Sequence, residues 1–257
     1  MSDEKDLTFY NLKERKWLTR LDRGSIVGHT SSNNTNIWFR FKKKGNYLLI
    51  ISKRSLKQDV LKELKKVENK YVIFRKSIKK EVSLIYTKEI YVDGNTDFTA
   101  MFNTFEDDLV QLLENTIYYY GAYNLDDNCW EIGIENSHFF KTMPENKITK
   151  SWDITFGLYS CHMPFDPKDK SKADASMWDL MEKELTFSDA KFVIGGGDQV
   201  YCDGVDYLNI WKWLKKVKKD KPTIEHMYSW YRDIYRGYWG FPGVKAIHRK
   251  LWLRYEF

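Results

Sequence analysis

A short apolar strand that runs directly into three glycines constrains this chain more than any other feature of its sequence. Residues 191–194 read Lys-Phe-Val-Ile, and Gly195, Gly196 and Gly197 then lead to Asp198. Glycine lets the backbone turn sharply where a side chain would clash, so Asp198 is expected to project from the end of a buried strand. In α/β folds, ligands bind beyond the carboxyl ends of the strands. The motif therefore predicts a functional edge here.

A second strand end lies upstream. Residues 152–159 alternate as a strand and lead into Ser160, Cys161 and His162. Cys161 and Asp198 are 37 positions apart, which is enough for one crossover between adjacent parallel strands. Residues 173–185 have the spacing of an amphipathic helix and fill this crossover. The strand-helix-strand order predicts an α/β layer with both loops at one edge.

The side chains on these two loops have the chemistry of metal ligands. Asp198, Tyr201 and Asp203 offer oxygen atoms, and Cys161 or His162 offers sulfur or nitrogen. This mixture suits iron, zinc or manganese better than a site for calcium alone. The competing interpretation is an ordinary strand-to-loop turn, with Cys161 a small buried residue and His162 a packing residue. The pattern alone leaves both interpretations open.

The segments around this layer are predicted as follows. Residues 207–217 and 224–235 have helical spacing, and the second helix begins after Pro222 with Thr223 as its N-cap. Residues 1–150 are β-rich, with strands expected near 24–29, 37–41 and 47–51, a hairpin turn over 42–46, and helices over 56–68 and 109–119. We expect two domains, an accessory β-rich domain at 1–150 and an α/β domain at 151–257.

Charge and cysteine content exclude several classes of protein. The net charge of +6 is spread over short lysine runs, so a specific nucleic-acid partner is not expected. Three cysteines without Cys-x-x-Cys spacing favour reduced thiols over a disulfide framework or a zinc module. The polar start and the lack of a long apolar run predict a cytoplasmic protein with no membrane partner. The sequence leaves the oligomeric state open.

Two segments of this sequence resemble the PhoD-like (alkaline phosphatase D-like) metallophosphatases. The segments are 156–164, Phe-Gly-Leu-Tyr-Ser-Cys-His-Met-Pro, and 193–201, Val-Ile-Gly-Gly-Gly-Asp-Gln-Val-Tyr. The aromatic and arginine-bearing stretch 231–239 extends the resemblance, and residues 24–30 with 37–40 are similar to the start of the β-sandwich domain in that family. The resemblance implies an α+β and α/β chain: a β-sandwich-like domain followed by a metallophosphatase α/β sandwich.

The resemblance also implies a set of ligands and a reaction. Carried over by motif, Cys161, Asp198 and Tyr201 hold a metal cluster of iron and calcium, with manganese or zinc as alternatives, and Asp198 bridges the metals. His162 and Asp203 have no firm counterpart in the family motif. The implied activity is metal-dependent hydrolysis of a phosphate ester.

Two arginines one helical turn apart, Arg232 and Arg236, are weaker candidates for binding the phosphate of a substrate. The other interpretation of these arginines, which we favour, is solvent exposure or an ion pair with Asp233 or Glu225.

The sequence departs from the family pattern near its end. The family continues, after a Pro-Gly turn like that at 242–243, to an Asp-Asp-His loop and further histidine loops that complete the ligand set. The printed sequence ends at Phe257 without them, so an incomplete α/β sandwich is expected, inactive by itself. The alternative function is a non-catalytic remnant that acts as a binding module through its β-rich half.

Overall fold

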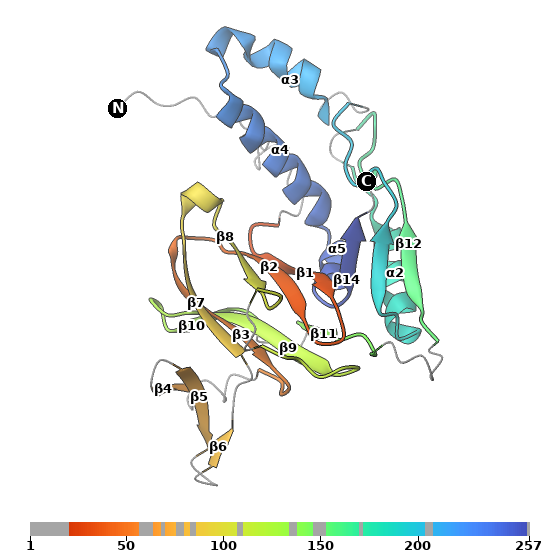
Figure 1. The fold of residues 1–257 in the computed structure, drawn as a ribbon. Helices are drawn as coiled ribbons and strands as arrows, with labels where there is room; N and C mark the ends of the chain where they lie inside the picture. The colour runs from red at the N-terminus through yellow and green to blue at the C-terminus, as the bar shows by residue number, and fades with distance from the viewer. Residues whose placement is uncertain are drawn as a thin grey trace.

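The computed structural model describes most of the chain. The described residues are 21–56, 64–67, 70–75, 80–82, 86–106, 110–133, 138–145, 153–169, 172–203 and 208–255. They form a mixed fold of antiparallel sheets, one parallel sheet and four α-helices (Figure 1). None of the described helices is both long enough and apolar enough to cross a membrane.

The N-terminal part contains two antiparallel sheets that share one core. The first sheet has the order β1-β2-β8, formed by Gly24–Thr30, Thr35–Arg40 and Thr99–Asn103. The second has the order β10-β9-β3-β7, with β11 paired to β9; its strands are Gly45–Ser52 (β3), Tyr86–Val92 (β7), Ile117–Asn124 (β9), Cys129–Ile132 (β10) and Phe139–Lys141 (β11). The rings of Phe39 on β2 and Tyr120 on β9 meet edge to face at 5.8 Å, both fully buried, so the two sheets pack through aromatic side chains.

A third antiparallel sheet stands apart from these two. Its strands are Leu64–Val67 (β4), Lys70–Arg75 (β5) and Lys80–Val82 (β6), in the order β4-β5-β6. It lies in the chain between β3 and β7, and these two strands pair with each other up to Ile51 and Tyr86. The chain therefore leaves and rejoins the larger sheet at one place (Figure 1). The short 3₁₀ turn η1, Gly94–Thr96, follows β7.

The expected hairpin across 42–46 is wrong. The strand before this turn, β2, pairs with β1 and β8, whereas the strand after it, β3, pairs with β7 and β9. The turn thus carries the chain from one sheet to the other. The rings of Phe41 and Tyr47 stack at 3.9 Å across the turn, so aromatic packing joins the two segments in the shared core.

Of two further expected helices, the one over 109–119 is not found, and the one over 56–68 lies mostly outside the described residues. Leu64–Val67 is a strand, and the other residues of the 56–68 segment, apart from Leu56, lie outside the described part of the chain. Residues 110–116 form no helix, and Ile117–Asn124 is strand β9. Tyr118 and Tyr120 are buried and Tyr119 between them is half-exposed, which is the two-residue period of a strand. Consecutive tyrosines fit a half-buried pleated surface better than a helix.

The C-terminal part contains the predicted parallel layer. Strands Phe156–Tyr159 (β12), Phe192–Gly195 (β13) and Trp252–Tyr255 (β14) are parallel in the order β12-β13-β14. Helix α2, Ser176–Phe187, forms the crossover between β12 and β13. The remaining helices are α3, Ile210–Val217, α4, Ile224–Trp239, and α5, Pro242–His248, with the 3₁₀ turn η3, Lys218–Asp220, after α3.

Helix α4 begins where the sequence predicts. The Thr223 side chain accepts a hydrogen bond from the His226 backbone N–H, and the His226 ring accepts one from the Thr223 N–H, which forms a capping box. Trp230, Ile234 and Tyr238 lie on its buried face and pack with Val193 of β13. This packing fixes the helix layer against the parallel strands.

Several long-range contacts join the β-rich part to the parallel layer. Strand β1 lies beside β14 and α5 (Figure 1). The Tyr120 hydroxyl donates to the Arg249 carbonyl at 2.8 Å, and the Leu21 N–H donates to the Arg236 carbonyl at 3.1 Å. The carboxylate of Asp97, after β7, forms ion pairs with Arg236 of α4 and Arg40 of β2.

Candidate functional site

The loops that follow β12 and β13 are hydrogen-bonded to each other. Tyr159 and Gly195 are partners in the parallel register, so both loops leave the sheet at the same level. Beyond them, the Gly196 N–H donates to the Tyr159 carbonyl at 2.7 Å and the Cys161 N–H to the Gly197 carbonyl at 3.2 Å. The His162 N–H donates to the Asp198 carbonyl at 3.0 Å. These bonds continue the strand pairing into the loops.

The backbone of both loops is left-handed at the predicted ligands. Cys161 has φ of +63° and Asp198 has φ of +50°, next to Gly197 at +122°. Residues with a Cβ atom adopt this conformation at a cost of roughly 1–2 kcal/mol, and such residues cluster at functional sites. The surrounding hydrogen bonds therefore hold the two side chains in a conformation that the residues do not themselves favour.

Two of the predicted ligands, Cys161 and Tyr201, contact the carboxylate of the third, Asp198. The Cys161 Sγ lies 3.5 Å from Asp198 Oδ2, and the Tyr201 hydroxyl donates to the same oxygen at 3.1 Å. Cys161 and Asp198 are exposed and Tyr201 is half-buried. Hydrogen bonding to Cys161, burial and the Asp198 carboxylate together raise the pKa of Tyr201. The thiol, carboxylate and phenol thus lie together at the ends of the two loops, and they are donor types that metal ions accept, so their role as metal ligands stays a prediction.

The other two candidate ligands, His162 and Asp203, do not join this cluster. The His162 ring is buried among aromatic rings, 4.8 Å from that of Trp178 and 5.4 Å from that of Tyr238, and burial lowers its pKa to about 4. Asp203 is exposed, and its carbonyl accepts from the Asn209 side chain at 2.6 Å. Among the described residues, neither forms a group with Cys161 and Asp198 at metal-ligand distances.

The arginines of α4 have other neighbours. Arg236 pairs with Asp97 and, at 3.3 Å, with Asp233, which is the ion pair that the sequence suggested. Arg232 is exposed. Both line a cavity of about 370 Å³ whose lining includes none of Cys161, Asp198 and Tyr201. Its other lining residues are Leu21, Trp38, Arg40, Asp97, Tyr228, Tyr231, Tyr235 and Trp239. A phosphate-binding role for the two arginines stays a prediction.

An apolar cavity of about 570 Å³ adjoins Cys161. Residues 158–164 form one side of it and helix α2 forms the other, with Met177, Leu180 and Met181 in its lining. Sequence reasoning missed this cavity, because α2 was interpreted only as a packing helix. The sequence shows that Met177 and Leu180 lie three positions apart, but only the structure shows that both are largely exposed.

A second group of possible ligands was also missed. Asp127, Cys129 and Glu131 lie within 4.8 Å of one another around the start of β10. Cys129 and Glu131 lie two positions apart on one face of β10, and Asp127 lies in the turn before it, a spacing that the sequence does show. Asp127 pairs with Lys43, and Glu131 pairs with Arg23 at 3.4 Å. The two carboxylates are therefore already neutralised by lysine and arginine.

One solved structure has a fold similar to the one described above. Among solved structures, the chain is similar to one described as "Structure of PhoD", with a TM-score of 0.53 and 14% identity. The match covers 91% of this chain and 38% of that chain, so the present chain spans well under half of the PhoD structure. At this identity the likeness concerns the fold.

The other comparisons add little. A β-glucuronidase from Bacteroides uniformis matches at 11% identity over 90% of this chain and 27% of that one, but its TM-score of 0.24 is too low to support a common fold. No protein-family model matches the sequence, and no curated protein matches it.

Proposed function

We propose that this chain belongs to a metal-dependent phosphoesterase of the PhoD-like type. The proposal rests on one observation: Cys161, Asp198 and Tyr201 lie together at the ends of two adjacent parallel strands. The fold likeness to PhoD supports it. Because the chain spans 38% of that structure, the activity and substrate of the whole protein are part of the proposal.

Each residue has a distinct task in the proposed site. Asp198 presents a carboxylate that can bridge two cations, Tyr201 a hard oxygen for a trivalent ion, and Cys161 a soft sulfur. Iron with calcium, the expected pair, would neutralise phosphoryl oxygens and lower the pKa of an attacking water. The left-handed backbone at Cys161 and Asp198 aims both side chains before any ion binds, which reduces the cost of ordering them.

Metal uptake tests this proposal without requiring turnover. We expect the purified chain to bind iron, and Asp198→Asn to lose most of that metal as measured by elemental analysis. Asparagine tolerates the left-handed conformation, so this change removes the charge and spares the backbone. The matched control is Asp203→Asn, which changes an exposed acid outside the cluster. Unchanged metal content in Asp198→Asn would remove Asp198 from the site.

Turnover is a separate measurement. A phosphomonoester and a phosphodiester, each assayed with iron, calcium or manganese, report hydrolysis by this chain and by any longer form of the protein. Metal-dependent hydrolysis that disappears in Asp198→Asn supports the proposal. A longer form that binds metal and hydrolyses neither ester contradicts it.

The alternative is a non-catalytic binding module. Large apolar side chains exposed on the β-rich half favour it, notably Tyr91 at 60%, Ile117 at 45% and Met101 at 44%. Such side chains are suited to a protein partner. Metal content discriminates the two functions, because a binding module has no need of the Asp198 cluster. A metal-free protein that captures a defined partner through these residues favours the alternative.

A further inference from the structure

Strand β12 forms one edge of the parallel sheet, and among the described residues no strand pairs with its outer side. The sheet has the order β12-β13-β14, so β12 pairs with β13 alone (Figure 1). The Tyr159 carbonyl accepts from the Gly196 N–H at 2.7 Å, so the backbone groups of Tyr159 are directed toward β13. Because these groups alternate between the two edges of a strand, those of Phe156 and Leu158 are directed outward.

The sequence of β12 lacks the features that protect an edge strand. Proteins shield such edges with lysine, proline, a bulge or a covering segment. Residues 154–160 read Ile-Thr-Phe-Gly-Leu-Tyr-Ser, without a charge or a proline. Leu158 is 68% exposed and Phe156 is 49% exposed. Apolar strands of parallel sheets are normally buried, so β12 has the composition of a strand with a neighbour on both sides.

The apolar cavity of about 570 Å³ next to Cys161, called here the β12 groove, lies beside this free edge. Its lining includes Leu158 and, on α2, Met177, Leu180 and Met181. The α2 residues at 177, 180, 181 and 184 have the spacing of one helix face. Met177 is 71% exposed and Leu180 is 51% exposed, so this face is open to solvent.

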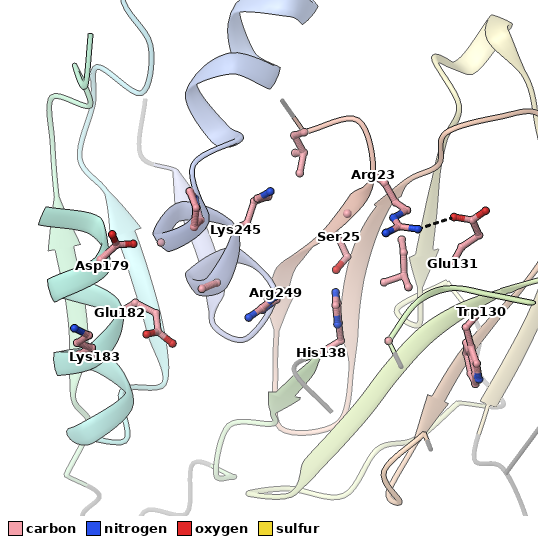
Figure 2. A pocket seen from close by; sticks show the side chains of 17 residues that line it. Arg23, Ser25, Trp130, Glu131, His138, Asp179, Glu182, Lys183, Lys245 and Arg249 are labelled. Atoms are coloured by element: carbon pink, nitrogen blue, oxygen red, sulfur yellow. Dashed lines mark hydrogen bonds and ion pairs between the residues drawn. The ribbon is translucent and has the colours of Figure 1, made fainter. Parts of the chain in front are cut away.

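The charged side chains of α2 lie on another side of the helix. A separate cavity, shared with α5, is lined by Asp179, Glu182 and Lys183 (Figure 2). A Cβ atom on Gly243 of α5 would lie 2.6 Å from the Asp179 carboxylate, and Glu182 pairs with Lys250 at 2.6 Å. Helix α2 thus packs charged residues against α5 and exposes apolar ones, the reverse of a surface helix that has no further partner.

The β12 groove also carries negative charge. Asp174, just before α2, and Glu184, in its last turn, both line the groove. Neither forms an ion pair with a described residue, and the described lining contains no lysine or arginine. Hydrogen bonds from Ser176 lower the pKa of Asp174, so this acid is charged at neutral pH. Basic residues on an occupant would complement this charge.

We propose that β12 and its groove bind an extended segment of a second polypeptide, which joins the sheet as an additional strand. The outward-facing backbone groups of β12 form the hydrogen bonds of this pairing. Side chains at alternate positions of the segment pack against Met177 and Leu180, and flanking lysine or arginine residues meet Asp174 and Glu184. The inference goes beyond the proposed function, because it needs neither metal nor hydrolysis.

A second copy of this chain fits the groove less well. Two copies paired edge to edge about a two-fold axis present the same surface to each other. Asp174 and Glu184 of both copies would then meet where the described lining has no cation. Like charges brought together oppose association. The charge therefore favours a different chain that carries basic residues.

Binding of a defined peptide to the chain tests this proposal. The probe is a short fluorescent peptide in which valine and threonine alternate between terminal lysines, followed by anisotropy. We expect saturable binding with a Kd below about 100 µM. Leu180→Gln should weaken it about fivefold, because it removes an apolar contact. The matched control is Phe187→Gln, which changes an exposed apolar residue of α2 outside the groove and should leave the Kd unchanged.

Changes in the peptide test the backbone pairing and the charge separately. Methylating every second amide nitrogen removes the donors of one strand edge. We expect one of the two alternate sets to abolish binding and the other to preserve it, because a strand pairs with β12 through one edge. Glutamine in place of the lysines should weaken binding, and Glu184→Gln should weaken the binding of the lysine peptide only.

Three results would overturn the proposal. These are no saturable binding up to about 1 mM peptide, equal weakening by Phe187→Gln and Leu180→Gln, and unchanged binding of both methylated peptides. Self-association that Leu180→Gln abolishes, measured by sedimentation, would assign the groove to a second copy instead. If Leu180→Gln fails to fold, Met177→Gln replaces it at a more exposed position of the same face. No hydrolysis is measured, so failure of the proposed function leaves this outcome unchanged.

Discussion

At the scale of single residues, buried histidines make stability depend on pH. His248 is 2% exposed and its ring packs against those of Trp178 and Trp239. Burial and the neighbouring His162 lower its pKa to about 3, so it is neutral in the folded chain. Its Nε2 has no hydrogen-bond partner among the described residues. Protonation therefore opposes folding at this position.

We expect the free energy of unfolding to fall as the pH drops below about 6.5, where the unfolded histidine binds a proton and the folded one does not. One such histidine contributes a slope of roughly 1.4 kcal/mol per pH unit between the two pKa values. Urea unfolding at several pH values from 7.5 to 5 measures it, with these limits chosen around the histidine range. His248→Phe should reduce the slope by about one histidine's share. An unchanged slope would show that His248 is not the group that titrates.

The proximity of Cys161, Asp198 and Tyr201 was predictable, because each lies within a few residues of a strand end. The sequence marks strand ends through apolar runs and glycines, and parallel strands bring these ends together.

Of the two acidic partners of Arg236, only one was predictable from the sequence. Asp233, three positions away, follows from helix geometry, but Asp97 is 139 positions away and no local pattern points to it.

At the scale of elements, the start of α4 depends on its cap. We expect Thr223→Ala to lower the free energy of unfolding by about 1 kcal/mol, because it removes the acceptor for the first-turn N–H of His226. Thermal unfolding measures the change. The matched control is Ser229→Ala in the middle of the same helix, where alanine favours helix formation and should not destabilise. A loss in the control as large as in Thr223→Ala would mean that the cap contributes nothing.

Elements with a strong local signal were predicted best. Helix α4 has a cap, a proline before it and a long apolar stripe, and its start is where the sequence placed it. The parallel pairing of β12 and β13 also follows from the crossover length.

The 42–46 turn was predicted wrongly, because a hairpin turn and a connection between two sheets have the same local composition. The choice depends on β7 and β9, which lie far along the chain.

At the scale of the whole molecule, one carboxylate links the β-rich part to the helix layer. Asp97 pairs with Arg40 of β2 and Arg236 of α4, whose side chains are 7% and 14% exposed. Although burial acts to raise it, the two arginines hold the pKa of Asp97 below its usual value. Without this carboxylate, two buried guanidinium groups would face each other.

We expect Asp97→Asn to lower the free energy of unfolding by roughly 2–3 kcal/mol, since it removes the ion pair of the buried Arg40 and leaves Arg236 with Asp233 alone. Asparagine also tolerates the positive φ of 54° at this position, so the change isolates the charge. Urea unfolding measures the loss. Asp153→Asn, which changes an exposed acid without a described partner, should cost less than about 0.5 kcal/mol. Equal effects of the two changes would contradict the role of Asp97.

The placement of β4, β5 and β6 has a consequence for how the chain tolerates variation in length. Because Ile51 of β3 pairs with Tyr86 of β7, the chain leaves and re-enters the larger sheet at adjacent positions. The entropy of closing such an excursion grows only with the logarithm of its length. This excursion is therefore a place where residues can be gained or lost over generations at little cost to the sheet, the parallel layer or the loops that carry Cys161 and Asp198.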